Sequence, residues 1–182
     1  MDKIQEIDKA ITINVNNIKE QIGKLSFETI CDFKPNKIHI PEIPWGSLNY
    51  PGIYLIEIKN DNKFDSFKPW IEDFQVKWEN EKYLRHFTPN LKKKRIVKHN
   101  ELKEWMPLYI GKSKRIEGRV HEHIFIDLHK STFALKINSR ENMRNETFRL
   151  KTIKCEVENY DIILPIIESE LRNKINPLIG KQ

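Results

Sequence analysis

Residues 51–59 read PGIYLIEIK and give the clearest predicted strand of the chain. The run is rich in β-branched and aromatic residues; Pro51-Gly52 opens it, and a turn-forming triplet at 60–62 closes it. Residues 107–111, PLYIG, predict a second strand that ends at Gly111. Each strand carries a glycine, an isoleucine and a tyrosine beside a turn, and we interpret the rest of the chain around this pair.

Hydrophobic periodicity predicts the other elements. Apolar residues recur every three or four positions in four segments, which predicts amphipathic helices at 2–22, 67–85, 114–129 and 165–175, the last with Pro165 as its first residue. Further strands are predicted at 131–137 and 147–157, and residues 23–49 read as irregular apart from an alternating run at 37–40. We therefore expect residues 1–48 to form an N-terminal helical extension on a domain spanning 49–182.

Length and composition limit the class of protein. The 182 residues suit one domain, and 38% hydrophobic with 32% charged residues exclude a collagen-like or wholly disordered chain. No stretch approaches the ~20 apolar residues of a membrane span, and the first residues lack the layout of a secretion signal, so we expect a cytoplasmic protein. Cys31 and Cys155 have no Cys-x-x-Cys spacing, which argues against a disulfide framework or a thiolate zinc site.

The charge balance favours an anionic partner. Lys and Arg number 32 against 26 Asp and Glu, which gives a net charge of +6, and the isoelectric point is near 9.2. An excess of this size attracts polyanions, of which nucleic acid is the commonest inside a cell. The alternative is that the richness in Lys, Asn and Ile reflects an AT-rich genome, so charge alone does not decide the partner.

Two tripeptides, Gly52-Ile53-Tyr54 and Tyr109-Ile110-Gly111, together resemble the signature of the GIY-YIG nuclease family. Arg119 follows the second tyrosine by ten residues and His123 comes one helical turn later, as in restriction-type members. Near the end of the chain Glu168 precedes a leucine by three residues and a proline by nine, which is similar to the closing helix of the family. The matching features occur in family order over a little under half of the chain.

The resemblance implies an α/β (α+β) fold with a small, three-stranded, mostly antiparallel sheet flanked by helices. It also implies hydrolysis of DNA phosphodiester bonds with a single Mg²⁺ (or Mn²⁺) ion, leaving 5′-phosphate and 3′-hydroxyl ends. The residues that it assigns to catalysis are Glu168 as metal ligand, Arg119 as phosphate clamp, Tyr54 or Tyr109 as base, and His123 and Lys112 as supporting groups.

Glu168 also has a physical rationale of its own. It shares the core-facing stripe of its predicted helix with Leu164 and Leu171. A carboxylate there is costly to bury unless something binds it, and a hard divalent cation with retained waters would do so. The alternative from helix geometry is an ion pair with Arg172, four residues later, and Glu170 is the second candidate ligand.

Arg119 and His123 lie four residues apart and project from one side of their predicted helix, so both could reach one phosphate. A guanidinium fits phosphate bidentately and stays charged. The alternative is a solvated helix face shared with Glu122. A tyrosine base needs a nearby cation, because a free phenol has a pKa near ~10. Lys112 or a charged His123 could supply that cation, or Lys112 could contact the phosphate instead.

The chain departs from the family between the tripeptides, which the family joins by a short hairpin. Here 55 positions separate the two signature tyrosines, so an insertion at about 60–106 lies on the hairpin. A basic and aromatic insertion suits a DNA-grasping element, and the alternative is a packing lid with solvated lysines. The candidates for nucleic-acid binding are Lys92, Lys93, Lys94 and Arg95 in the insertion, and Lys112, Lys114 and Arg115 after the second tripeptide.

A second departure lies at the C-terminal end. The position three residues after Pro177 is commonly asparagine in the family and is Gly180 here. Asn176 or Asn173 could replace that contact.

We therefore expect a magnesium-dependent endodeoxyribonuclease of the restriction or the phage and mobile-element type, because the chain has no room for the further domains of an excision-repair subunit. One alternative is a catalytically inactive protein that keeps the fold and binds nucleic acid. Another is an assembly protein whose charge is incidental. DNA is the expected partner, a membrane is not, and a homodimer on the substrate would suit a double-strand cut.

Overall fold

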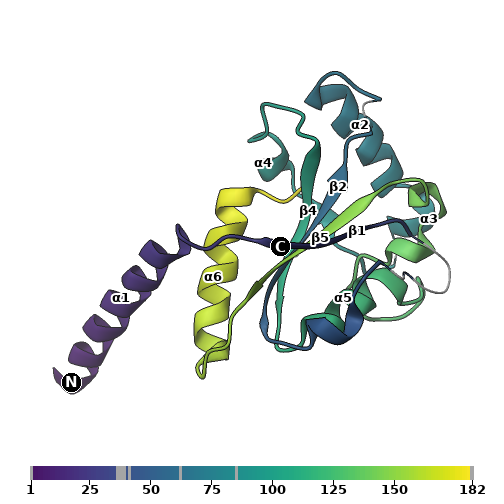
Figure 1. The fold of residues 1–182 in the computed structure, drawn as a ribbon. Helices are drawn as coiled ribbons and strands as arrows, with labels where there is room; N and C mark the ends of the chain where they lie inside the picture. Colours follow the sequence, from purple (N-terminus) through teal and green to yellow (C-terminus); the bar gives the residue numbers. More distant parts are fainter. Residues whose placement is uncertain (1, 36–39, 41, 62, 85, 181–182) are drawn as a thin grey trace.

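A four-stranded antiparallel sheet with the strand order β1-β5-β2-β4 forms the centre of the computed structural model (Figure 1). The structure describes residues 2–35, 40, 42–61, 63–84 and 86–180. The strands are β1 (Glu28–Phe33), β2 (Gly52–Lys59), β4 (Trp105–Ser113) and β5 (Phe148–Lys154). The two strands predicted from the tripeptides are neighbours, and β4 lies at one edge of the sheet.

The sheet has one strand more than the three expected, because β1 lies in the segment 23–49 that we predicted to be irregular. β1 pairs with β5, and Arg149 donates hydrogen bonds of 2.6 and 3.0 Å to Asp32 across the pair. A register shift between Thr29 and Cys31 interrupts the alternation of buried and exposed side chains, which is the signal that predicts a strand. The expected alternating run at 37–40 lies largely outside the described residues.

The central strand β2 is buried on both faces. Its alternating side chains divide the core into two clusters: Tyr54 and Ile56 pack with α5 (Ile116–Phe125) and α2 (Phe67–Trp78), whereas Ile53 and Leu55 pack with α6 (Tyr160–Ile175) and the end of α1 (Asp2–Ile22). Burial of each such aliphatic side chain contributes about 1.5–3 kcal/mol. Helices therefore cover both faces of the sheet (Figure 1).

The insertion connects β2 to β4 and packs firmly on the core. The helix predicted at 67–85 is divided into α2 and the short α3 (Glu81–Leu84), in which Tyr83 is buried and Leu84 is exposed. Trp70, Phe74 and Trp78 stack along the buried side of α2, with ring centroids 5.6 and 5.9 Å apart. The basic run contributes to α4 (Lys93–Ile96).

The strand predicted at 131–137 is wrong, and α5 is shorter than the predicted 114–129. Residues 126–147 form bends and the 3₁₀ turns η2 (Ile137–Ser139) and η3 (Glu141–Met143); a further one, η1, spans Trp45–Leu48. Lys136 has a positive φ of 56°, and its buried amine donates to the carbonyls of His86, Leu128 and Lys130 at 2.6–2.9 Å. Hydrogen bonds from this lysine, rather than the backbone pairing of a strand, therefore stabilise the loop.

Helix α6 begins five residues before the predicted start. Pro165 lies inside it rather than at its first position, and the carbonyl of Asn159 accepts the N–H groups of Ile162 and Ile163. The helix ends at Ile175, and Asn176 follows with a φ of 53°. A left-handed residue at this position is a common helix ending.

The C-terminal segment binds the insertion to the sheet. β6 (Ile179–Gly180) pairs with β3 (Asn90–Leu91) of the insertion, and the N–H of Leu178 donates to the carbonyl of Pro107 at the start of β4 (2.9 Å). The insertion is therefore held on two sides, by the core and by the last described residues of the chain.

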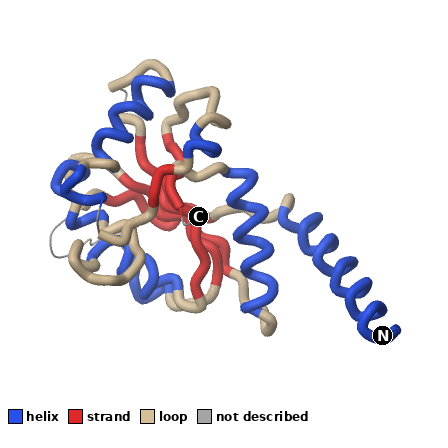
Figure 2. The backbone as a smooth tube through the Cα atoms, turned by 180° about the vertical axis from the view of Figure 1, so that it is seen from behind, coloured by secondary structure: helices blue, strands red, loops and turns tan. Residues whose placement is uncertain are grey.

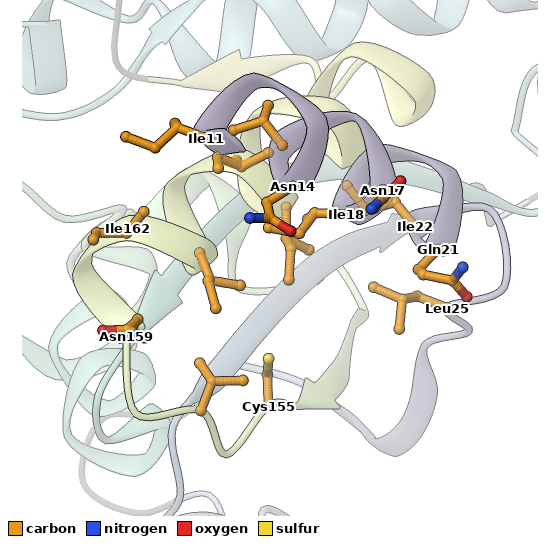
Figure 3. A pocket seen from close by; sticks show the side chains of 15 residues that line it. Ile11, Asn14, Asn17, Ile18, Gln21, Ile22, Leu25, Cys155, Asn159 and Ile162 are labelled. Atoms are coloured by element: carbon orange, nitrogen blue, oxygen red, sulfur yellow. The ribbon is translucent and has the colours of Figure 1, made fainter. Parts of the chain in front are cut away.

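Helix α1 projects away from the rest of the molecule (Figures 1 and 2). Ile22 is its one buried residue among those described, and Ile4, Ile7, Ile11 and Ile13 are more than half exposed. A largely apolar groove of about 710 Å³ lies between α1 and α6 (Figure 3), and residues such as Ile18 and Cys155 line it. No described helix is both long and apolar enough to cross a bilayer.

Candidate active site

Tyr54 of β2 and Tyr109 of β4 lie side by side, with ring centroids 6.2 Å apart. Tyr54 is opposite Gly111 in the strand register, and a Cβ at Gly111 would lie 2.3 Å from the Tyr54 hydroxyl oxygen. Any residue larger than glycine at position 111 would therefore clash with the side chain of Tyr54. The two signature strands form one unit, in which the missing side chain of Gly111 makes room for the phenol.

His123 of α5 supports Tyr54 from behind. Its Nε2 lies 2.8 Å from the Tyr54 hydroxyl, and its Nδ1 accepts the backbone N–H of Leu135 at 3.1 Å. Burial lowers the pKa of His123 well below its usual 6.5, and the positive charge of Arg119 lowers it further. The ring is therefore neutral, and because Nδ1 accepts, the proton resides on Nε2 and is donated to Tyr54.

The structure separates the predicted pair of Arg119 and His123. His123 is fully buried, so it contacts Tyr54 and not a phosphate, and the expectation that both residues reach one phosphate is wrong. Arg119 keeps about a quarter of its side chain exposed. Its guanidinium pairs with Glu122 and donates to the carbonyl of Phe133 at 2.6 Å, so the alternative pairing with Glu122 is present as well.

The pKa values of both tyrosines are raised, not lowered as a base near a cation was expected to show. Burial is the largest cause for each. Arg119 is the cation that acts in the opposite direction and lowers the pKa of both phenols. Of the two expected sources of positive charge, Lys112 and a charged His123, the second is absent because that ring is neutral.

Glu168 of α6 approaches the tyrosines from the other face of the sheet. Its negative charge raises the pKa of both Tyr54 and Tyr109. The carboxylate is 15% exposed; Oε1 accepts a hydrogen bond from Arg172, and Oε2 lies 3.8 Å from Nζ of Lys112. The alternative ion pair with Arg172 is therefore formed, and Lys112 points to Glu168 rather than to a tyrosine. Residues from α5 and α6, on opposite faces, meet at the edge formed by β4.

A divalent cation would have one carboxylate here. The described residues contain no group of three or more His, Cys, Asp or Glu side chains placed to hold a metal. Magnesium is nevertheless often held by a single carboxylate, several waters and the phosphate of the substrate. The hard oxygen ligand of Glu168 fits that mode, in which substrate and ion bind together. The second candidate, Glu170, is turned toward α1 and pairs with Lys19 at 3.5 Å.

The remaining predicted residues surround this cluster. Lys114 pairs with Asp161 at 2.7 Å and lies over the ring of Tyr160, and Arg115 is exposed before α5. In the insertion, Lys93 and Lys94 are exposed, whereas Lys92 and Arg95 are partly buried against Gly180.

Neither proposed substitute for the family asparagine reaches the cluster. Asn173 is exposed, and the side chain of Asn176 donates to the carbonyl of Lys174 (3.4 Å) at the helix end. The carbonyl of Asn176 instead accepts a hydrogen bond from His99 of the insertion (2.7 Å). Asn176 therefore has a structural role.

Two backbone groups that orient the site were not predicted from the sequence. The carbonyl of Phe133 fixes Arg119, and the N–H of Leu135 fixes the tautomer of His123. Both belong to the segment predicted as a strand. No residue type signals such a contact, because every residue carries the same backbone groups.

Comparisons with protein-family models, with curated proteins and with solved structures found no match to this chain.

Proposed function

We propose that this chain is a metal-dependent endonuclease that hydrolyses DNA phosphodiester bonds in the manner of the GIY-YIG nucleases, as a restriction or phage and mobile-element enzyme. One observation carries the proposal: two phenols, a guanidinium and a carboxylate from four separate elements converge at the β4 edge of the sheet. Phosphodiester hydrolysis needs these groups, because it must activate a water and neutralise charge on the phosphoryl oxygens.

Tyr109 is the group that we assign as base. It is more accessible than Tyr54, 7% against 1% exposed, and burial raises its pKa less severely. His123 donates to Tyr54, which leaves the Tyr54 hydroxyl proton available for an ionised Tyr109, and the positive charge of Arg119 also stabilises that ionised form. Tyr54 and His123 are then positioning residues.

The other groups act on the phosphate. Arg119 would bind the non-bridging oxygens, while Glu168 would hold a single magnesium or manganese ion, which supplies charge neutralisation when bound. The ionised Tyr109 takes a proton from the attacking water, the new P–O bond forms, and the bond to the 3′ oxygen breaks, after which this oxygen takes a proton from solvent. The products carry a 5′-phosphate and a 3′-hydroxyl.

Replacement of the carboxylate tests the proposal. The wild-type chain should nick or linearise plasmid with Mg²⁺ and not with EDTA, and Glu168→Ala should reduce cutting by at least about 100-fold because the ion loses its protein ligand. Glu170→Ala is the matched control, since it removes a neighbouring carboxylate that pairs with Lys19. Gel assays of plasmid topology measure the rates. Equal cutting by both variants would contradict the assignment.

The tyrosine assignment gives a second prediction. Tyr109→Phe should abolish cutting, whereas Tyr54→Phe should retain a measurable fraction, about 1–10%, because it removes a donor to the base rather than the base. Single-turnover cleavage at saturating protein separates this effect from binding. If Tyr54→Phe is the more damaged variant, the roles are reversed.

The principal alternative is a protein that keeps this arrangement and binds nucleic acid without cutting it. The ion pairs of Glu168 with Lys112 and Arg172 favour it, because they neutralise the carboxylate without a metal. Retained DNA binding without cleavage under Mg²⁺ and Mn²⁺ would support this alternative. An absence of any salt-sensitive DNA binding would instead favour an assembly protein.

A further inference from the structure

Three cations from distant parts of the sequence gather at the C-terminal end of α6. Lys92 and Arg95 belong to the insertion, and Arg172 belongs to the last turn of α6. Figure 1 shows α4 beside this end of the helix. The arrangement is fixed by backbone contacts, since β3 pairs with β6 and the N–H of Lys92 donates to the carbonyl of Leu178 (2.8 Å).

The side chains of Lys92 and Arg95 converge over Gly180. A Cβ built on this glycine would lie 3.0 Å from Nη1 of Arg95 and 3.9 Å from Cε of Lys92. Any larger side chain would press against the guanidinium. Gly180 thus leaves room for the two cationic groups at the position where the family commonly has an asparagine.

Lys92 and Arg95 lack an anionic partner within the described part of the chain, whereas Arg172 pairs with Glu168. Nη1 of Arg95 is fully buried and has no hydrogen-bond acceptor there, and neither Lys92 nor Arg95 has a carboxylate within ion-pair distance. Burial lowers the pKa of both side chains, and repulsion adds to it, from Arg95 on Lys92 and from Arg172 on Arg95. Holding Lys92 and Arg95 together without a counter-ion of their own is costly, and a bound anion would remove that cost.

The cluster is adjacent to the candidate active site. Arg172 donates to Oε1 of Glu168, and its positive charge also acts on Arg95 of the insertion. An anion bound by Arg95 would therefore lie beside the position of the scissile phosphate. Successive phosphates of one DNA strand offer anions at regular short intervals.

We propose that Lys92, Arg95 and Arg172 form a second phosphate-binding subsite, which holds the backbone phosphate of the DNA strand next to the scissile one. This inference rests on the proposed function for its substrate. The insertion then has a defined role: it supplies two of the three cations and brings them to the end of α6. Lys93 and Lys94, in the same run, are exposed and do not take part.

The experiment compares four charge-neutralising variants that each remove one positive charge from the same run. Affinity for a dye-labelled DNA duplex is measured by anisotropy in EDTA, where no cutting occurs, over a range of salt concentrations. Arg95→Gln and Lys92→Gln should each weaken binding roughly tenfold and reduce the slope of log K against log salt by about 1. Lys93→Gln and Lys94→Gln should change affinity less than threefold and leave the slope unchanged.

Two further measurements locate the phosphate and control for folding. In one set of duplexes, a single uncharged methylphosphonate linkage is moved along the strand, and the wild type should bind more weakly when the linkage is at one position beside the scissile phosphate. The affinity of Arg95→Gln should not fall further at that position, because the contact is already lost. Arg95→Lys should restore most of the affinity, which a merely structural arginine would not allow. Thermal melting identifies any variant that is unfolded, and Lys92→Gln then replaces Arg95→Gln in the comparison.

The outcomes separate this inference from the proposed function. Equal losses in all four variants, or no DNA binding by the wild type, overturn the subsite. Selective losses at Lys92 and Arg95 support it even if the chain does not cut DNA, in which case the proposed function fails alone. Cleavage that depends on Glu168, together with equal losses in the four variants, leaves the proposed function and removes the subsite.

Discussion

Tyr54 contacts three of the groups that make the site. Its ring packs over Gly111 and beside Tyr109, and its hydroxyl accepts a hydrogen bond from His123. The side chain is nearly completely buried, so its orientation is fixed by packing as well as by hydrogen bonds. At this scale, the candidate chemistry depends on a neutral histidine deep in the protein.

The buried histidine gives a prediction on pH. The folded-state pKa of His123 lies well below 6.5, so as the pH falls below about 6.5 the unfolded chain takes up a proton that the folded chain does not. The contribution of His123 to stability is therefore complete above that pH and is lost as the pH falls toward the folded-state pKa. We expect the free energy of unfolding to fall by up to about 1.4 kcal/mol per pH unit from this group.

Urea denaturation at a series of pH values measures this slope. His123→Gln should reduce it, whatever its stability at neutral pH, whereas the exposed His121→Gln should leave it as in the wild type. An unchanged slope in His123→Gln would show that the imidazole is not buried in its neutral form.

Six residues were assigned to catalysis from the sequence, and their catalytic roles stay predictions. In the structure, printed contacts join Tyr54 to His123 and to Tyr109, and Lys112 to Glu168, while the charge of Arg119 acts on both tyrosines. The sequence did not predict that His123 lies behind Tyr54, or that Lys112 faces Glu168, because these depend on burial and on side-chain direction. The cation cluster at Gly180 depends on the pairing of β3 with β6, two strands of only two residues each, which carry no usable pattern.

Among the helices and strands, prediction succeeded where apolar residues recur at regular intervals or form a continuous run. The helix at 2–22 and the strands around Tyr54 and Tyr109 were predicted correctly. The errors have local causes: a bulge hides β1, and a buried lysine stabilises a loop at 131–137. At the start of α6 we gave proline its commonest helical position, whereas the chain accommodates it in the interior.

Pro165 gives a prediction for this helix. A proline inside a helix removes one hydrogen bond and crowds the carbonyl four residues earlier, here that of Asp161. Pro165→Ala should therefore raise the stability by about 1 kcal/mol or more, since the side chain is exposed and no core contact is lost. Thermal and denaturant unfolding measure the change. A loss of stability would indicate that the helix begins at the proline, where its ring would be favourable.

At the scale of the whole molecule, the apolar surface is unevenly distributed. Most of the more than half-exposed isoleucines lie on α1, and a stripe of Ile4, Ile7 and Ile11 continues into the groove against α6. Apolar patches of several hundred Å² on soluble proteins commonly mark contact surfaces. A second copy of the chain is the partner that would suit a cut in both DNA strands.

We therefore expect the molar mass in solution to rise with concentration from the 21.8 kDa of one chain toward twice that value. A double variant, Ile4→Glu with Ile7→Glu, should remain a single chain, because it places two charges in the stripe. Ile13→Glu is the matched control: Ile13 is equally exposed and lies on another side of α1. Sedimentation equilibrium measures the masses, and a wild type that stays at one chain throughout would contradict the prediction.

The two ends of the chain differ in how they can be handled. The last described residues, Leu178 to Gly180, are buried and pair with the insertion, whereas the first turns of α1 extend away from the body (Figure 2). A purification tag or a fluorescent protein should therefore be fused to the amino terminus. A protein attached to the carboxyl terminus would disturb the pairing of β3 with β6, which positions Lys92 and Arg95.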